Sequence, residues 1–430
     1  MGLAIVATLS LATLSLGARE ATAEALLLVD AETGKVLHAE NAAYPWYPAS
    51  VTKLMTAYVS LKAIKDGRIT ADSLFSVSPN AVAQQPSKMG FPIGTQVTVD
   101  NALKMLMVKS ANDMAVVLAE GVSGSIEKFA DEMNRTAARL GMTQSSFVNP
   151  NGLPADEQIT SARDLAILAR ALLRDFPEYD LYWHIPAIKF GRRIMRNTNR
   201  LIDAYPGADG MKTGFICASG FNLVATATRA NKRLIAVVLG APSSAARAMK
   251  AAQLLERGFN SNTGLAWLMP TLGTVESLQP VSAEPPNLRD EMCGGHRKRP
   301  ATEDEDDAIA VTANSSPDSP YAVFLSSLRP KAKGGALLQG DNMGEPVLVY
   351  TGTKPPAPGT VQAGWGEPKA KAAKKKTATA KLTPSKDKES AKEGASSAAA
   401  PPGEAPPAKP KPKKPAAKPA ASTQQTSQAK

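Results

Sequence analysis

Histidine and cysteine are both scarce in this 430-residue sequence. The three histidines, His38, His184 and His296, stand far apart, and no serine lies in a GxSxG sequence, so we expect no Ser-His-Asp triad. The two cysteines, Cys217 and Cys293, form no CxxC pair and are too few for a disulfide framework. These absences argue against a metal site and against a redox motif. We therefore expect neither a metal nor a cofactor.

A run of apolar residues long enough to cross a membrane is also missing near the N-terminus. The apolar stretch from Leu3 to Leu16 is shorter than the span of about 20 residues that a bilayer requires. It is followed by Ala21-Thr22-Ala23, a small-x-small cleavage pattern, which predicts that residues 1–23 are a secretory signal peptide. No Lys or Arg precedes the stretch, although signal peptides normally carry one there. A buried core helix is the alternative interpretation.

Aromatic residues make up only 5% of the chain and proline occurs 33 times, so a good part of the chain is not expected to form packed core. The net charge of +11 arises mainly in residues 367–430, which hold 15 Lys and no Arg against five Asp and Glu. The rest of the chain is close to neutral, so we expect no nucleic-acid partner. We predict a disordered tail over residues 367–430 and a Pro-rich linker over residues 273–366. The linker contains an acidic run and two short apolar islands, residues 321–328 and 345–352.

The region between the signal peptide and the linker mixes strand and helix patterns. Two short apolar runs joined by AETG predict a hairpin over residues 25–38. Periodicity and capping signals predict helices and strands farther on, with helices over 50–67, 99–120 (interrupted at 110–112), 126–140, 160–174 and 244–258 and strands over 220–229 and 232–241. This order predicts an α+β catalytic domain over residues 24–272, with an antiparallel sheet packed against a helical subdomain.

Ser50-Val51-Thr52-Lys53 forms an SxxK sequence at the start of a predicted helix. Residues at i and i+3 share one helix face, so the lysine amine can reach the serine hydroxyl. A serine is a weak nucleophile until a base removes its proton, and a buried lysine beside another cation can stay neutral and act as that base. Three other SxxK matches occur, at Ser125, Ser385 and Ser427, and an N-cap serine followed by a solvated lysine is the alternative.

Two further motifs follow along the chain. Ser110-Ala111-Asn112 is an SxN that interrupts a helix, and Lys212-Thr213-Gly214 is a KTG directly before a strand-like run. Gly214 would let a substrate approach the backbone closely. Taken singly, the first can be a capped helix break and the second a turn. We expect Cys217, close to the KTG, to be a small buried side chain, and His38 to lie on the surface.

The order and spacing of SxxK, SxN and KTG resemble those of the serine β-lactamase and penicillin-binding protein superfamily. The segments YPASVTKLMTAY, VKSANDMAVVLAE and ADGMKTGFICASGFNLVATA are similar to the site segments of the D-alanyl-D-alanine carboxypeptidase family within it, over about residues 25–260. The intervening NPNGLP and TSARDLAILARALLRDFPEY resemble that family too. The resemblance implies a serine peptidase that removes the terminal D-alanine from peptidoglycan stem pentapeptides, binds penicillin and works in the periplasm.

The family's catalytic roles transfer to matching positions of this sequence. The resemblance implies that Ser50 is the acylated nucleophile, that Lys53 is its general base and that Ser110 passes a proton to the leaving D-alanine. It implies that Asn112 holds the lysine and the substrate amide. Lys212 would supply positive charge, which keeps the general base neutral and attracts the substrate carboxylate.

Substrate recognition is assigned in the same way. The Thr213 hydroxyl would bind the substrate carboxylate, and Arg247 matches a position implicated in recognising it, although a solvated first-turn arginine is the alternative. The oxyanion hole is expected from the backbone N–H groups of Ser50 and Phe215.

Several other functions remain open at this point. The same site can act as a DD-endopeptidase on cross-links, and an inactive wall-binding relative is a further alternative. A β-lactamase is disfavoured, because no ExxLN-like segment lies between residues 112 and 212. The amphipathic helix that anchors many relatives to the inner membrane is not evident, so we expect the Lys/Pro/Ala-rich tail to bind anionic membrane or wall surfaces, with a solvated spacer as the alternative.

Overall fold

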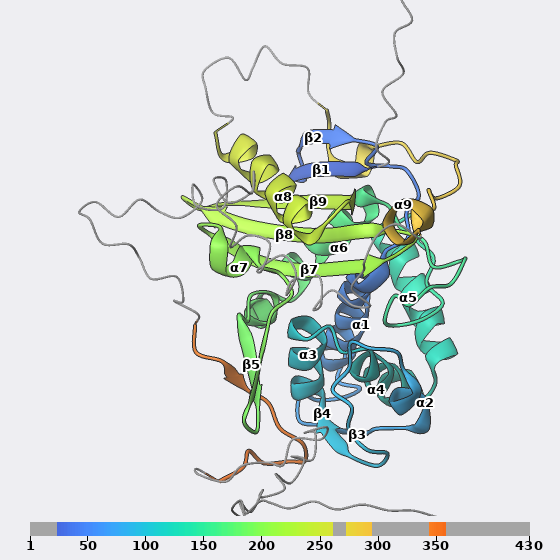
Figure 1. Ribbon diagram of the computed structural model, residues 1–430, viewed down its shortest axis with the longest axis vertical. Helices are drawn as coiled ribbons and strands as arrows, with labels where there is room; N and C mark the ends of the chain where they lie inside the picture. The colour runs from blue at the N-terminus through green and yellow to red at the C-terminus, as the bar shows by residue number, and fades with distance from the viewer. Residues whose placement is uncertain (1–23, 261–271, 295–343, 358–430) are drawn as a thin grey trace, which may run out of the picture. The chain divides into compact units, whose positions relative to one another are not determined.

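The computed structural model describes residues 24–260, 272–294 and 344–357 (Figure 1). The predicted signal peptide, the acidic run, the first apolar island at 321–328 and the predicted disordered tail lie outside these residues. Within the described ranges, no helix is both long and apolar enough to cross a membrane.

A five-stranded sheet forms one layer of the molecule, with the strand order β2-β1-β9-β8-β7 (Figure 1). All of its neighbouring strands are antiparallel. The strands are β1 (Ala25–Asp30), β2 (Val36–Glu40), β7 (Ala208–Ile216), β8 (Gly220–Arg229) and β9 (Lys232–Ala241). The predicted hairpin and both predicted strands are therefore confirmed, as is the α+β class.

Both faces of this sheet are covered, which explains why β1 is apolar from Ala25 to Val29 and β9 is apolar from Leu234 to Leu239. Leu27 of β1 packs with Val237 of β9 into the cluster that faces the larger set of helices. Leu28 packs with Val238 into a second cluster, which includes residues of helix α8 (Ser244–Phe259). Successive side chains of a strand point to opposite faces, so a strand buried on both faces cannot alternate between polar and apolar residues.

The other layer is a group of helices around α1 (Lys53–Lys65). Ten of the 13 residues of α1 are buried, which makes it the central element of this group. The remaining helices and short strands of this part are α2 (Pro79–Ala83), α3 (Val99–Val108), α4 (Asn112–Ser123), α5 (Ile126–Leu140), α6 (Ala162–Asp175), η2 (Pro177–Trp183), β3 (Leu74–Ser76) and β4 (Gln96–Thr98). Helix α7 (Leu201–Ala204) instead lies beside β7, and its Leu201 packs into the cluster that includes residues of α8.

Side-chain caps mark where several of these helices begin. The hydroxyls of Thr98, Ser125, Ser161 and Ser243 each accept a hydrogen bond from a backbone N–H in the first turn of α3, α5, α6 and α8 respectively. Such caps satisfy N–H groups that have no partner within the helix. The predicted interruption of the 99–120 helix is also observed, because α3 ends at Val108 and α4 begins at Asn112.

Residues 272–294, here called the strap, follow the sheet domain and pack along its surface. The strap contains η4 (Val275–Ser277) and α9 (Arg289–Cys293). Its backbone bonds to the β1–β2 turn, where Val275 N donates to Gly34 O over 2.9 Å, and farther on Leu288 N donates to Ala218 O over 3.0 Å. The domain boundary that we predict at residue 272 is therefore crossed by many contacts.

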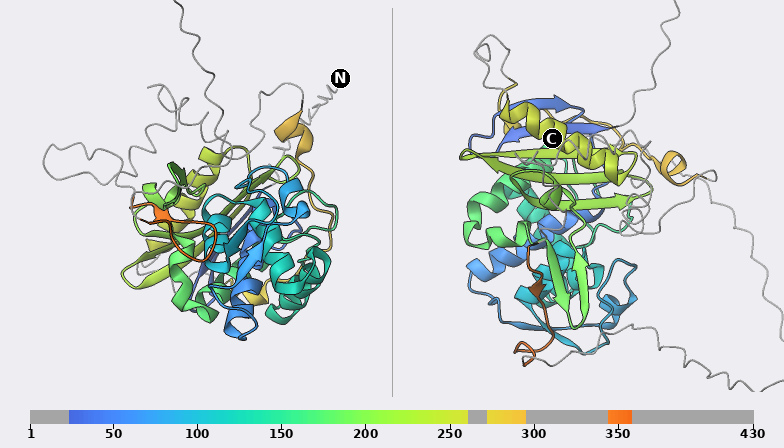
Figure 2. Two further views of the ribbon diagram at one scale, coloured as in Figure 1. Left: turned by 90° about the horizontal axis from the view of Figure 1, so that it is seen from below. Right: turned by 60° about the vertical axis from the view of Figure 1, so that its left-hand side comes forward.

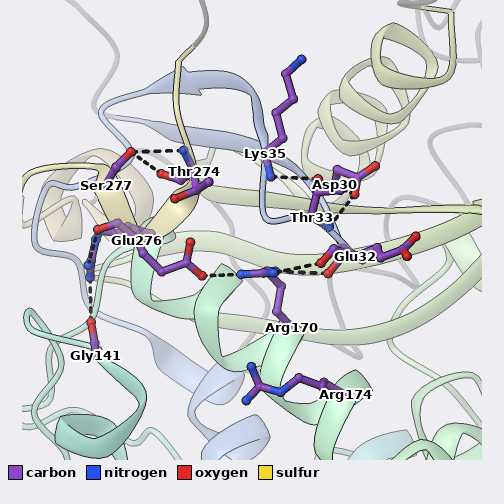
Figure 3. A network of polar contacts seen from close by, with 12 residues as sticks. Asp30, Glu32, Thr33, Lys35, Gly141, Arg170, Arg174, Thr274, Glu276 and Ser277 are labelled. Atoms are coloured by element: carbon purple, nitrogen blue, oxygen red, sulfur yellow. Dashed lines mark hydrogen bonds and ion pairs between the residues drawn. The ribbon is translucent and has the colours of Figure 1, made fainter.

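Arg163 and Arg170 of α6 hold the start of the strap, and Figure 3 shows Arg170 beside Glu276. Arg170 pairs with the Glu276 carboxylate and also donates to the carbonyls of Ala31 and Glu32 in the β1–β2 turn, each over 3.1 Å. The buried Arg163 donates to Glu276 O over 3.2 Å. One residue of the strap is thus fixed through both its backbone and its side chain.

A disulfide between Cys217 and Cys293 ties the end of the strap to the β7–β8 turn. Our expectation that Cys217 is a free, small buried side chain was therefore wrong. The two cysteines are 76 residues apart in the sequence, so no local pattern predicts that they pair. Folding brings α9 to this turn.

The predicted apolar island at residues 345–352 docks on the domain. Its strand β10 (Val347–Leu348) pairs in parallel with β5 (Ala187–Phe190), which forms a hairpin with β6 (Arg193–Arg196) (Figure 2). Val349 is buried and donates its backbone N–H to Lys189 O over 2.9 Å. This part of the predicted linker is therefore attached to the domain through β5.

Replacing both cysteines of the disulfide by serine is expected to lower the free energy of unfolding by about 2–4 kcal/mol, because the bond restricts the unfolded chain. Denaturant titration of the full chain in non-reducing buffer measures the change. Adding a reductant should bring the wild-type protein down to the stability of the double variant. Equal stability of the two proteins before reduction would contradict the expectation.

Candidate active site

Ser50 lies in the 3-10 turn η1 (Ala49–Thr52), which runs directly into α1. Lys53 is the first residue of that helix, so the two side chains of the SxxK sequence share one face, as the spacing predicts. The Lys53 Nζ lies 2.9 Å from the Ser50 Oγ. The hydroxyl and the amine are therefore within direct proton-transfer distance.

The Lys53 amine is completely buried and is held by two more acceptors. It donates to Asn112 Oδ1 and to the backbone carbonyl of Asn151, each over 2.7 Å. A buried amine needs such partners because it has lost its hydration. These bonds hold the amine in place beside the Ser50 hydroxyl.

Asn112 is placed by a neighbouring loop as well as by helix α4. Its backbone N–H donates to Ser87 O and its amide Nδ2 donates to Gln85 O, each over 2.8 Å. The loop is held in turn by the buried carboxylate of Asp113, which accepts hydrogen bonds from the backbone of Met89 and Gly90.

The Asp113 carboxylate is itself perturbed by its position. Burial raises the pKa of Asp113, and the hydrogen bonds that its carboxylate accepts from backbone N–H groups oppose that rise. Through this loop, the hydrogen bonds of Asn112 to Gln85 and Ser87 orient its side-chain amide, with the Oδ1 toward Lys53.

Ser110 closes the site between α3 and α4. Its backbone has a positive φ of 58°, which points the residue out of the helix path. The Ser110 Oγ is buried and has no hydrogen-bond partner among the described residues. A buried hydroxyl without a partner is costly, and at a catalytic site it indicates that a bound group supplies the partner.

The KTG segment lies in β7, at the edge of the sheet nearest the nucleophile. A Cβ added at Gly214 would lie 2.8 Å from the backbone nitrogen of Ser50, a distance that real Cβ atoms do not adopt. The absence of a side chain therefore allows β7 to pass directly beside the nucleophile. Phe215 is the next residue of the strand, so the two expected oxyanion donors come from adjoining segments.

Lys212 and Thr213 are both buried in this strand. The Lys212 amine donates to Thr213 O over 3.1 Å. The Thr213 hydroxyl lies 2.7 Å from the hydroxyl of Thr198, which precedes α7. The structure thus brings residues of SxxK, SxN and KTG into one site through the contacts of Lys53 and Gly214.

Arg247 is connected to β7 indirectly. It belongs to the first turn of α8, is buried, and donates to Asn222 O over 3.3 Å. Its guanidinium lies 5.7 Å from the centre of the Phe221 ring, which stacks on Phe215 at 4.2 Å. The solvated alternative for Arg247 is therefore wrong, while its contact with a substrate carboxylate stays a prediction.

His38 lies away from this site. His38 is on β2, and β2 and β7 are the two opposite edges of the sheet. Its Nδ1 is 3.1 Å from Arg257, and burial, followed by the charge of Arg257, lowers the pKa of His38. His184 lies near Asp180 in η2. In the described part of the chain, no three His, Cys, Asp or Glu side chains cluster as a metal ion would require.

Several groups in the site carry no sequence signal of their own. The carbonyls of Gln85, Ser87 and Asn151 belong to the backbone, which any residue type supplies. Asn222 is another example, because its Nδ2 donates to the carbonyls of Tyr47 and Pro48 just before the nucleophile. Only the turn-rich sequence NPNGLP could have drawn attention to residue 151.

Comparison with known proteins agrees with this geometry. A sequence model of the D-alanyl-D-alanine carboxypeptidase family matches residues 12–243, which is more than half of the chain. The chain belongs to this family. The family match includes Ser50, Lys53, Ser110, Asn112 and the KTG segment, while the strap and the docked island lie beyond it.

Individual members of the family show the extent of the similarity. D-alanyl-D-alanine carboxypeptidase DacA of Haemophilus influenzae is 37% identical over 243 residues, which are 55% of this chain and 62% of that protein. The chain therefore spans less than two thirds of the length of this relative.

Solved structures of relatives share the fold. Penicillin-binding protein 5 from Haemophilus influenzae has a TM-score of 0.54 and 37% identity, covering 55% of this chain and 71% of that one. Penicillin-binding protein D2 from Listeria monocytogenes, in its cefotaxime-bound form, has a TM-score of 0.51 and 29% identity, covering 55% of this chain and 96% of that one.

Proposed function

We propose that the protein is a serine D-alanyl-D-alanine carboxypeptidase that works through an acyl-enzyme on Ser50. The observation that carries this proposal is the contact of 2.9 Å between Lys53 Nζ and Ser50 Oγ, with the amine held by Asn112 and Asn151. A serine and a base in this arrangement are suited to nucleophilic catalysis. Membership of the carboxypeptidase family points to D-alanyl-D-alanine peptides as the substrate.

The reaction begins when the Ser50 hydroxyl attacks the carbonyl between the two D-alanines while Lys53 accepts its proton. The negative charge on the carbonyl oxygen would be stabilised by the backbone N–H groups of Ser50 and Phe215, and each such donor contributes about 3 kcal/mol to lowering a barrier. The carbon–nitrogen bond then breaks, and the proton held by Lys53 passes through the Ser110 hydroxyl to the departing amine, which leaves Lys53 neutral again. Water hydrolyses the ester and releases a peptide that is one D-alanine shorter.

The remaining site residues bind the substrate. Asn112 would orient the substrate amide along with Lys53. Lys212 would attract the terminal carboxylate and Thr213 would hydrogen-bond it. The Arg247 guanidinium, which lies beside the Phe221 ring of β8, would add positive charge that attracts the same carboxylate.

β-Lactams would acylate the same serine and leave slowly, and the cefotaxime-bound relative supports this partner class. DD-endopeptidase action on cross-links is the second candidate, although nothing in the described site favours it over the first. An inactive wall-binding relative is less well supported, because every motif residue is in place. We further propose secretion to the periplasm and an anionic membrane or wall surface as partner of the tail.

Labelled penicillin tests the proposal when it is incubated with the full chain and the adduct is mapped by mass spectrometry. A stable adduct on Ser50 is expected in the wild-type protein and not in Ser50→Ala. Ser60→Ala is a matched control, since Ser60 is a buried serine of α1 whose hydroxyl donates to the Thr56 carbonyl. Release of D-alanine from a pentapeptide by the same samples then separates the carboxypeptidase from the wall-binding alternative. A folded wild-type protein without an adduct would refute the acyl-serine mechanism, and rapid turnover of the label would favour a β-lactamase.

A further inference from the structure

Thr198 is a buried residue that has no role in the mechanism given above. It lies between β6 and α7, and only 3% of it is exposed. Its hydroxyl oxygen lies 2.7 Å from the hydroxyl oxygen of Thr213, and either group can be the donor in this bond. A residue outside the three motifs thus contacts the side chain to which carboxylate binding is assigned.

The turn that carries Thr198 is fixed on both sides. The Asn197 side chain donates to Ile185 O and the Asn199 side chain donates to Gly210 O, each over 2.9 Å. The two asparagines also bond each other, because the Asn199 backbone N–H donates to Asn197 Oδ1 over 2.8 Å. Since Gly210 belongs to β7, these bonds attach the turn to the KTG strand and hold the Thr198 hydroxyl in place.

The chemistry of the substrate sets the direction of the bond between the two threonines. An ionised carboxylate only accepts hydrogen bonds, whereas a hydroxyl has a single proton to donate. If Thr213 gives its proton to a carboxylate, Thr198 must be the donor in the bond between the two hydroxyls. Donation by Thr198 also polarises the Thr213 hydroxyl and strengthens its own donation.

We propose that Thr198 is a positioning residue that orients the Thr213 hydroxyl toward the terminal carboxylate and so makes the site selective for substrates with a free carboxylate. This inference rests on the proposed function, because it needs Thr213 to contact the substrate. Thr198 itself acts through Thr213 and does not touch the reacting atoms.

Two substitutions separate the contribution of the Thr198 hydroxyl from that of the shape of the side chain. Thr198→Val keeps the branched side chain and removes the hydroxyl, while Thr198→Ser keeps the hydroxyl and removes a methyl group. The probes are benzylpenicillin, which carries a free carboxylate, and its methyl ester, which does not. The second-order rate constant for acylation of Ser50 is measured by mass spectrometry for the wild-type full chain and for each variant, with each of the two probes.

Thr198→Val is expected to slow acylation by benzylpenicillin about fivefold to tenfold, which corresponds to the loss of one hydrogen bond between two uncharged groups. Its reaction with the ester should stay within about twofold of wild type, and Thr198→Ser should keep the wild-type preference for the acid. Equal slowing with acid and ester would mean that Thr198 only supports the fold, and unchanged rates would also overturn the inference. A wild-type protein that reacts with neither probe would refute the proposed function itself, and the inference with it.

Discussion

Replacing Lys53 by methionine is expected to slow the acylation of Ser50 by penicillin about a thousandfold, within the range that general-base catalysis contributes. Methionine fills the space of the lysine stem but cannot accept the serine proton. The Lys53 amine is the group that hydrogen-bonds Ser50 at 2.9 Å, and it is buried with its other bonds on Asn112 and Asn151. Stopped-flow or quenched mass spectrometry of the adduct measures the rate.

The matched control for this prediction is Lys62→Met on the same helix. Lys62 is partly exposed and pairs with Asp66 at i+4, so its loss should change neither the acylation rate nor the stability by much. Both variants are assayed well below their unfolding temperatures, so that a change in stability does not enter the rate. Acylation of Lys53→Met at more than about a tenth of the wild-type rate would rule out Lys53 as the main base.

Replacing Arg163 by methionine is expected to lower the free energy of unfolding by about 3–5 kcal/mol, because it leaves the charge of Asp164 buried without its partner. The side chains of Arg163 and Asp164 are 6% and 0% exposed, and their closest atoms are 2.6 Å apart. Arg163 also donates to the carbonyls of Gly141 and Glu276, which join α5 and the strap to α6. Denaturant titration of the full chain measures the change.

The cost should depend on pH in a defined direction. Burial already raises the pKa of Asp164, and removing Arg163 raises it further. The folded state then holds a proton that the unfolded state releases, so the free energy of unfolding falls as pH rises above 3.8, the ordinary pKa of an aspartate, and through the raised pKa. The deficit of Arg163→Met relative to wild type is therefore smaller at low pH than at neutral pH.

Arg174→Met on the same helix is the control, since the Arg174 side chain is 69% exposed and its pairing with Asp175 should contribute at most about 1 kcal/mol. The double variant Arg163→Met/Asp164→Asn should recover part of the loss, because it removes the unpaired charge. If Arg163→Met and Arg174→Met were equally mild, the buried pair would not be important for stability.

The elements that the sequence predicted are those with a repeating local pattern. The 126–140 helix has a serine cap and one apolar face, and the structure begins α5 at Ile126 and ends it at Leu140. The run from Lys232 to Ala241 was predicted as a strand from its strand-like pattern, and the structure forms β9 over these residues. Local patterns also fix the three motifs, since SxxK needs only the turn of one helix to join its side chains.

Contacts between distant segments could not be predicted in the same way. Nothing in the composition of EPVLVYTG says that it would pair with β5, because any short apolar strand can join an open edge. The pairing of Cys217 with Cys293 depends on the path of the strap, and that path is set by backbone bonds and by two arginines of α6. The contact between Thr198 and Thr213 likewise exists only because the Asn197–Asn199 turn is attached to β7.

The central position of α1 also has a consequence for how the protein moves. Amide hydrogens in an element buried on all sides exchange with solvent only when the whole domain opens, whereas surface segments open locally at lower cost. Ten of the 13 residues of α1 are buried and Lys53 begins the helix, so we expect the proposed general base to lie on the part of the molecule that opens least.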